Sequence, residues 1–500
     1  MQINLGKPFS WTSQDVLREV TRWGLLYFLL TTAFSLWNYQ EKFVLDGYAH
    51  IFFITNFKAF VSPAQREIMT IQQVLPVLLA NFDASIKTVM LSYVFSVYAL
   101  YTIGFLVIIL WFKDAPSAIF YLLVHYKGMP YYYFMVVEEL LPGVCVAIIF
   151  LSAVRNFHVF KNRYLGFSFL FALFLLVVRS HPIAMVSLGL SMPLLWFTHR
   201  HFFMKEWKLV VVGVVLGLIA VASKVFMLNN YDSSTINAMK SYSYSVSQLF
   251  NVGYFLHLLF IILYAHPFFM LLLGSVLLLL YFRKEYQNAG MVVLLMVLGL
   301  SVFNMAVTPD SMRNVDFTSM VFDIRSIQIR VVGFAAFAYY FLPAINLYVF
   351  YEWFKGAILF LFAIGIIQIY TSKKASKEYL EQAHKIIERC REKGVRKAII
   401  SINELVGGVP VHHNCYQDIM VISSLDDAKA TIQAVYVDNN AKPNVAQLSA
   451  DSLLLDLGLA PNHMSELNEK LYNLPEEPYT LVHIHNNLIN NGNPKPESEP

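Results

Sequence analysis

Charged residues that border long apolar stretches are the first candidates for chemistry in this 500-residue chain. Such residues are costly at membrane depth and are functional suspects by default. Asp46 follows the first apolar stretch, in Leu45-Asp46-Gly47-Tyr48, and His50 comes four residues later. A carboxylate at this boundary could act as a general base toward a bound hydroxyl, with His50 helping to bind the ligand. The alternative is an acid that only marks a helix end.

Glu138 and Glu139 form a second candidate, because two adjacent acids interrupt the otherwise apolar stretch 131–154. Neighbouring residues on a helix point about 100° apart, so at most one of them faces a given partner. They could supply a second acid, a ligand for a sugar hydroxyl or a metal ligand. The alternative is an ion pair with Arg179 that joins two helices.

Arginines and a histidine form a third group of candidates. Arg179 and His181 occupy a very short turn, while Arg325 and Arg330 stand near the entrance to a late apolar stretch. A guanidinium group binds phosphate through paired hydrogen bonds, so these residues suit an anionic headgroup. The alternatives are an arginine that extends to the membrane surface, anchoring, and local Asp–Arg pairing.

Composition indicates which elements must position these residues. Hydrophobic residues make up 57% of the chain and charged residues 14%, with a mean hydropathy of +0.53. Soluble domains are nearer 45–50% apolar and about 25% charged, so a soluble enzyme, a disordered chain and a disulfide scaffold are excluded. The net charge is only +4 and no basic stripe occurs, which argues against a nucleic-acid partner.

The remaining class is an all-α polytopic membrane protein with about eleven transmembrane helices and a small C-terminal α/β domain. Long apolar stretches must be helical in a bilayer, since backbone groups have no water partners there. His266-Pro267 lies inside one such stretch and predicts a kink. His266 could relay a proton there, and the alternative is a histidine bonded to a neighbouring helix. The predicted spans are 22–38, 89–112, 116–129, 131–154, 164–180, 182–198, 209–227, 255–282, 289–307, 329–350 and 354–371.

Loop charges predict the orientation. One set of loops is short and basic and includes Lys113 and Arg155, whereas the long loops 39–88, 228–254 and 308–328 are poorer in basic residues. We therefore expect a multi-pass protein of a bacterial inner membrane with a cytoplasmic N-terminus. All the candidate residues above then fall on the outer face, and the short basic loops carry no comparable set.

The chain divides into a membrane domain over 1–371, a small α/β domain over 372–485 and a disordered Asn/Pro/Glu-rich end over 486–500. Loop 39–88 is expected to hold two interfacial helices broken at Ser62-Pro63. Eleven spans would place the tail outside with this loop, but the lysines after residue 371 argue the other way. In the tail, 398–402 and 480–485 indicate strands, whereas 418–424 and 431–437 could be strands or helix segments.

This pattern resembles the GT-C superfamily of integral-membrane glycosyltransferases over about residues 20–370. The resemblance rests on the many spans, the long first external loop with interfacial helices, and an acid just after the first span, here Asp46. It implies a polyprenyl-phosphate sugar as donor, a lipid-linked partner rather than a resident cofactor. Arg325 and Arg330 would match the donor-phosphate contacts, and a divalent metal could bind through Asp46 and Glu138.

The resemblance also implies a reaction, the transfer of a sugar to an envelope acceptor outside the membrane by inverting displacement. Asp46 would deprotonate the acceptor, with Glu138 or Glu139 as a second acid, and Arg325, Arg330 and Arg179 would neutralise the leaving phosphate. Three alternatives stay open: a transporter or flippase of a lipid-linked saccharide, a polysaccharide polymerase or ligase, and a non-catalytic subunit. A transporter would carry polar residues through the bilayer depth.

Overall fold

The computed structural model describes residues 14–43, 46–62, 67–125, 139–226, 266–306, 320–344, 347–401, 415–437, 448–454 and 461–484. The chain forms two compact units. The helical unit comprises 1–42, 60–76 and 91–373, and the mixed unit comprises 43–59, 77–90 and 374–500. The first loop thus contributes to both units.

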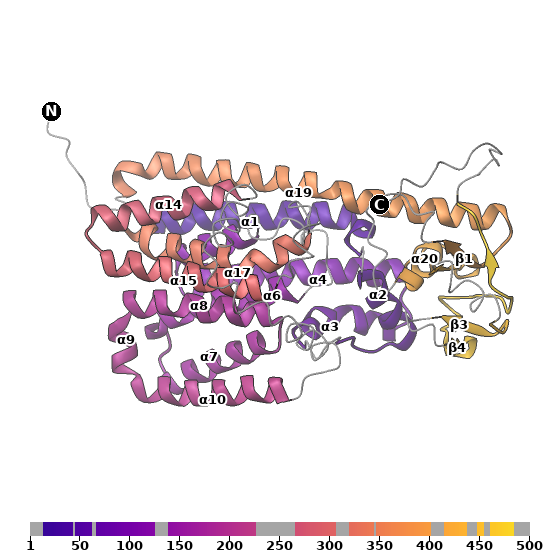
Figure 1. Cartoon of the computed structure of the whole chain (residues 1–500), viewed down its shortest axis with the longest axis horizontal. Helices are drawn as coiled ribbons and strands as arrows, with labels where there is room; N and C mark the ends of the chain where they lie inside the picture. Colours follow the sequence, from indigo (N-terminus) through magenta and orange to yellow (C-terminus); the bar gives the residue numbers. More distant parts are fainter. Residues whose placement is uncertain are drawn as a thin grey trace, which may run out of the picture. The chain divides into compact units, whose positions relative to one another are not determined.

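In the described residues, the helical unit consists of helices joined by short connections, as Figure 1 shows. Because most are apolar on nearly every face, each can bury one side against its neighbours and leave another apolar side outward. Close packing joins α6 to α7 and α8, and α17 to α8, α14 and α15. Two helices, α3 (Ile68–Asn81) and α4 (Ile86–Leu106), have residues in both units. The other main helices of the helical unit are α1 (Gln14–Trp37), α5 (Ala115–Leu123), α6 (Leu140–Arg155), α7 (Arg163–Val178), α8 (Pro182–Thr198), α9 (Arg200–Lys205), α10 (Trp207–Phe226), α14 (Pro267–Phe282), α15 (Tyr286–Ala306) and α17 (Met320–Ala336).

One helix among the described residues, Ile86–Trp111, is long and apolar enough by length and composition to cross a membrane. It consists of α4 and a π-helical turn, Val107–Trp111. At 1.5 Å per residue its 26 residues span about 39 Å. Eight further apolar helices of 10–17 residues lie in the same described part of the chain. The expectation of a mostly helical chain with a small C-terminal sheet is confirmed, and the number of membrane spans stays a prediction.

Capping residues fix where several of these helices begin. The side chain of Asn162 accepts hydrogen bonds from the backbone N–H groups of Tyr164 and Leu165 at the start of α7. His181 caps α8, whose first residue is Pro182. Proline suits this position because its missing N–H would have no partner within the helix. The predicted break at residues 179–181 is therefore a tight helix hairpin.

Two helices near the end of the helical unit differ from the prediction. α17 begins at Met320 and continues through a π-helical turn (Phe337–Phe341) and α18 (Leu342–Ala344), so the second half of the predicted loop 308–328 is helical. α19 (Leu347–Glu392) is one helix of 46 residues and merges the predicted span 354–371 with the amphipathic helix after it. No proline lies within 320–336 or 347–392, and the charged residues there did not by themselves end either helix.

The mixed unit is built around a three-stranded parallel sheet in the order β2-β1-β5. In β1 (Lys397–Ser401) every residue is buried, and it pairs with β2 (Gln433–Val437) and β5 (Thr480–Leu481). Parallel neighbours need a crossover, which α20 (Cys415–Ser423) supplies between β1 and β2. The segment 418–424, whose type the sequence left open, is thus largely helical. A short hairpin of β3 (Ser452–Leu454) and β4 (Pro461–His463) was not predicted.

The helix that begins at Asp46, α2 (Asp46–Phe57), belongs to this mixed unit and packs against α20. The hydroxyl of Thr55 lies 2.6 Å from that of Tyr472, and both side chains are buried. Asn56 accepts a hydrogen bond from the backbone of Asn468 and donates to the carbonyl of Glu466. The first loop and the C-terminal tail therefore share one folded body.

Candidate functional site

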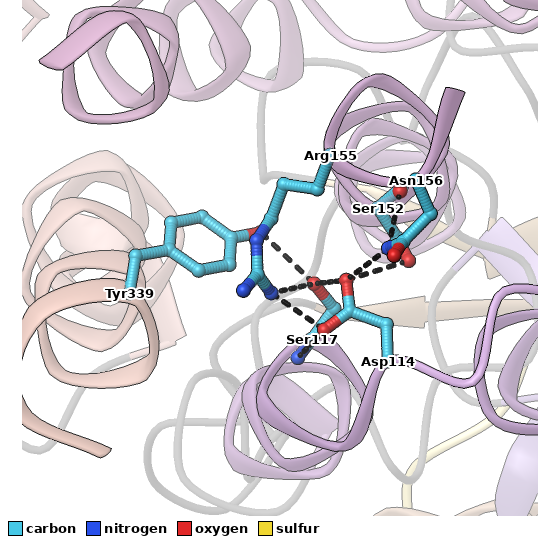
Figure 2. A network of polar contacts seen from close by, with 6 residues as sticks. All are labelled: Asp114, Ser117, Ser152, Arg155, Asn156 and Tyr339. Atoms are coloured by element: carbon cyan, nitrogen blue, oxygen red, sulfur yellow. Dashed lines mark hydrogen bonds and ion pairs between the residues drawn. The ribbon is translucent and has the colours of Figure 1, made fainter. Parts of the chain in front are cut away.

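A buried carboxylate, Asp114, organises the first polar centre of the helical unit (Figure 2). Asp114 is 3% exposed and caps the N-terminus of α5. It accepts hydrogen bonds from the backbone and hydroxyl of Ser117 at 3.2 and 2.7 Å, and from the Ser152 hydroxyl at 2.9 Å. Asn156 Nδ2 donates to the same carboxylate at 3.0 Å. Residues of α5 and the C-terminal end of α6 thus converge on one side chain.

Arg155 completes this centre with an ion pair. Its Nη1 lies 2.5 Å from Asp114 Oδ1, and its guanidinium stacks 4.7 Å from the ring centre of Tyr339. The Tyr339 hydroxyl lies 3.2 Å from that of Ser117, which links the π-helical turn after α17 to α5. His199, just after α8, feels both charges, and its pKa is lowered to about 4, chiefly by burial.

The Asp114 centre suits stabilisation better than proton transfer. Two carboxylate oxygens offer about four lone-pair sites, and five donors already use them. A general base must instead present a lone pair to its substrate. The short basic loops nevertheless contribute a polar centre, because Asp114 and Arg155 both belong to it. The sequence signal was Asp114-Ala115-Pro116-Ser117, a typical helix start.

Arg330 marks a second polar centre of the helical unit. Its side chain is fully buried, ten residues after α17 begins at Met320. At 1.5 Å per residue this places it about 15 Å along the helix, well inside rather than at the predicted entrance. A charge buried among apolar helices is expensive and marks a functional site by default.

Helix packing brings His266 toward Arg330. His266 precedes α14 as its N-cap residue, and the charge of Arg330 acts on its imidazole. One turn further, the ring of Phe269 packs on Phe334 at 5.8 Å and fills the space beside Gly333. Residues three to four apart share a helix face, so His266 and Arg330 lie on the facing sides of α14 and α17. We call this pair the Arg330 centre.

Gln328 is a further buried polar residue on α17, but it faces another way. It is fully buried, and neither its amide oxygen nor its amide nitrogen has a hydrogen-bond partner within the part of the chain that the structure describes. Residues two apart on a helix do not share a face, so Gln328 does not belong to the Arg330 centre. An unpaired buried amide costs about 1–3 kcal/mol, and nothing in the sequence pattern had singled it out.

The turn with Arg179 and His181 makes two local contacts, and its predicted role in substrate binding stays a prediction. Arg179 pairs with Glu67, with Nη1 and Oε1 2.9 Å apart and both side chains nearly half exposed. The ion pair of Arg179 is therefore made with Glu67, whereas the sequence had suggested Glu138 or Glu139 as its partner. His181 Nδ1 accepts a hydrogen bond from the backbone of Ile183 at 3.1 Å. The structure thus assigns His181 to capping α8.

Asp46 and His50 lie in α2 of the mixed unit. Asp46 is the first residue of that helix. His50 is 5% exposed, and burial lowers its pKa to about 4, so the imidazole is neutral at pH 7. Its Nδ1 has no hydrogen-bond partner among the described residues. The predicted substrate-binding role of His50 stays a prediction.

The other predicted site residues are only partly described. Glu138 lies outside the described residues, so its role stays a prediction, as does metal binding through Asp46 and Glu138. Glu139 directly precedes α6 and does not cap it with its side chain. Arg325 lies within α17 rather than in a loop. Over the described ranges, no group of three or more His, Cys, Asp or Glu residues is arranged to hold a metal ion.

The chain was compared with protein families, curated proteins and solved structures. No family model matches the chain, and neither a curated protein nor a solved structure matches it significantly.

Proposed function

We propose that the chain is a polytopic membrane glycosyltransferase that takes its sugar from a polyprenyl-phosphate donor. The observation that carries the proposal is Arg330, a fully buried arginine on an apolar helix and opposite His266. The energetic cost of such a charge is offset when it binds an anion. A phosphate carried on a long apolar chain is an anion that can enter an apolar helical unit.

In this proposal Arg330 binds the donor phosphate and stabilises the charge that grows on it. The acceptor oxygen forms a bond to the anomeric carbon while the bond from that carbon to the phosphate oxygen breaks. The acceptor proton passes to a carboxylate, and polyprenyl phosphate leaves. Positioned charge is the largest source of rate for a leaving group that is already good. Arg179 pairs with Glu67, and the proposal assigns it no part in this step.

Membrane insertion is part of the same proposal. It is supported by the 57% hydrophobic composition and by the apolar helices packed in the helical unit. Because α2 and the C-terminal tail share one folded body, both must lie on the same side of the membrane. One predicted span precedes α2 and eleven precede the tail, and both odd numbers place these segments on the same side. The lysines after residue 371 are therefore poor guides to the side of the membrane on which the tail lies.

A flippase for the same lipid-linked saccharide is the second candidate. It is favoured by the position of Arg330 about 15 Å along α17, since transport requires polar residues at depth. Both candidates bind the same anion and differ in what happens to it afterwards.

One preparation separates them. The full chain is reconstituted into liposomes with radiolabelled polyprenyl-phosphate sugars, and both sugar transfer and movement between leaflets are measured. We expect wild-type transfer that is lost in Arg330→Gln, with Asp46→Asn and Glu139→Gln testing the base. Movement between leaflets without transfer would replace the glycosyltransferase by the flippase. Neither activity with any donor would refute the proposal.

A further inference from the structure

A large apolar groove lies in the helical unit between α6, α7, α8 and α10, which run alongside one another in Figure 1. Its volume is about 460 Å³, a size typical of ligand sites. Its lining is almost entirely aliphatic and aromatic, with Glu206 as the one charged residue. The wall formed by α10 is open outward, since Val214 and Leu218 are more than half exposed.

The length of the groove matches one leaflet of a bilayer. Along α10 the lining runs from Val210 to Val221, which is about 17 Å at 1.5 Å per residue. The hydrocarbon core of a bilayer is about 30 Å thick, so one leaflet contributes about half of that. A single acyl chain that stands along α10 would therefore fill the groove from one end to the other.

Glycines keep the groove open. A Cβ atom added to Gly189 of α8 would meet nothing within 4 Å. At Gly213 and Gly217 of α10 the added atom would lie 3.2 Å from the rings of Phe167 and Phe174, which form the opposite wall. A larger residue at position 189 would therefore occupy the groove without a clash among the described residues.

One end of the groove carries a basic and aromatic rim. This rim lies where α7 and α10 begin, beside Glu206, whose charge acts on Arg163. Tyr164 and Trp207 are more than half exposed there, as expected for residues at headgroup level. The exposed cations of the rim are Lys161, Arg163, Lys205 and Lys208. Four cations against one acid favour an anionic headgroup.

We propose that this groove binds one acyl chain of an anionic membrane phospholipid, whose phosphate contacts the basic rim. The proposal rests on the membrane placement given under the proposed function and is independent of the Arg330 centre. It predicts a resident lipid rather than the sugar donor. Because the rim and groove are separate from Arg330, sugar transfer is not needed to test it.

The test is lipid binding by the purified full chain in detergent, measured by native mass spectrometry with phosphatidylglycerol or phosphatidylcholine. We expect phosphatidylglycerol to bind at least about tenfold more tightly. Arg163→Gln and Lys208→Gln should each weaken phosphatidylglycerol by about fivefold and leave phosphatidylcholine unchanged, because each cation near the headgroup contributes about that factor. Lys377→Gln, at an exposed lysine of α19, is the charge control.

The groove itself is tested by filling it. Gly189→Leu should abolish the binding of both lipids, whereas Gly274→Leu should not, although an added Cβ atom also meets nothing there. Val214→Trp fills the groove from the other wall and decides the matter if Gly189→Leu does not fold. Equal binding of the two lipids would overturn the headgroup assignment, and full binding by a folded, filled variant would overturn the site. If the wild-type chain binds phosphatidylglycerol as expected but transfers no sugar, only the proposed function is contradicted.

Discussion

Asp114 and Arg330 are both buried charges of the helical unit, and their surroundings differ in a way that separates stabilisation from function. Asp114 lies where helices end, and it accepts five hydrogen bonds, one of them from the Arg155 guanidinium (Figure 2). Arg330 lies well inside a helix, and its charge acts on the imidazole of His266. We expect the Asp114 network to hold helices together and Arg330 to bind the anion of the proposed function.

The largest effect on folding should come from the Asp114 centre. Asp114→Ala removes one partner of a buried ion pair and should lower the free energy of unfolding by about 3–5 kcal/mol. Asp15→Ala is the matched control, because Asp15 pairs with Arg18 on the exposed surface, where such pairs contribute about 0–1 kcal/mol. Unfolding of the purified full chain in detergent measures both. Equal losses would remove the distinction between the two kinds of ion pair.

Substitution of Arg330 should affect sugar transfer more than folding stability. Arg330→Gln should reduce sugar transfer by about a hundredfold or more, as removal of a single charge-stabilising group does. The same preparation should unfold at a denaturant concentration closer to wild type than Asp114→Ala does. A transfer rate near wild type in Arg330→Gln would place Arg330 with Asp114 as a structural charge.

His50 is a buried titratable group of the mixed unit, and we expect it to make folding stability depend on pH. Its pKa is about 4 when folded and 6.5 when unfolded, so the unfolded chain binds more protons between these values. Stability therefore rises with pH through this window and is lost on acidification, by about 2 kcal/mol at pH 5. Unfolding at pH 7.5 and pH 5 should show this loss in wild type and a smaller one in His50→Gln. An unchanged loss would exclude His50 as its source.

The smallest expected effect calibrates an ordinary buried hydrogen bond. Tyr472→Phe removes the hydroxyl that meets Thr55 and should cost about 1 kcal/mol of unfolding free energy. Tyr370→Phe, at a tyrosine that is 69% exposed, should cost almost nothing. If the two variants unfold alike, α2 and the tail are not joined by this contact.

Periodicity and composition predicted most of the helices but not the polar centres. Apolar stretches are local signals, so α1, α4, α7, α8 and α15 fall close to their predicted places. The Asp114 centre joins residues 114, 155 and 339, which only packing brings together. Arg325 and Arg330 were placed near a helix entrance because charges suggested a loop there, but helix propensity does not exclude arginine. The tail's union with α2 depends on side-chain contacts more than 400 residues apart.

The central claim is that Arg330 binds the phosphate of a lipid. The most direct measurement is the shift in thermal unfolding that polyprenyl phosphate produces in wild type, in Arg330→Gln and in Arg18→Gln as an exposed charge control. A ligand that binds only the folded state stabilises it, so we expect a rise in unfolding temperature for wild type and Arg18→Gln and none for Arg330→Gln. An equal rise in all three proteins would contradict the claim.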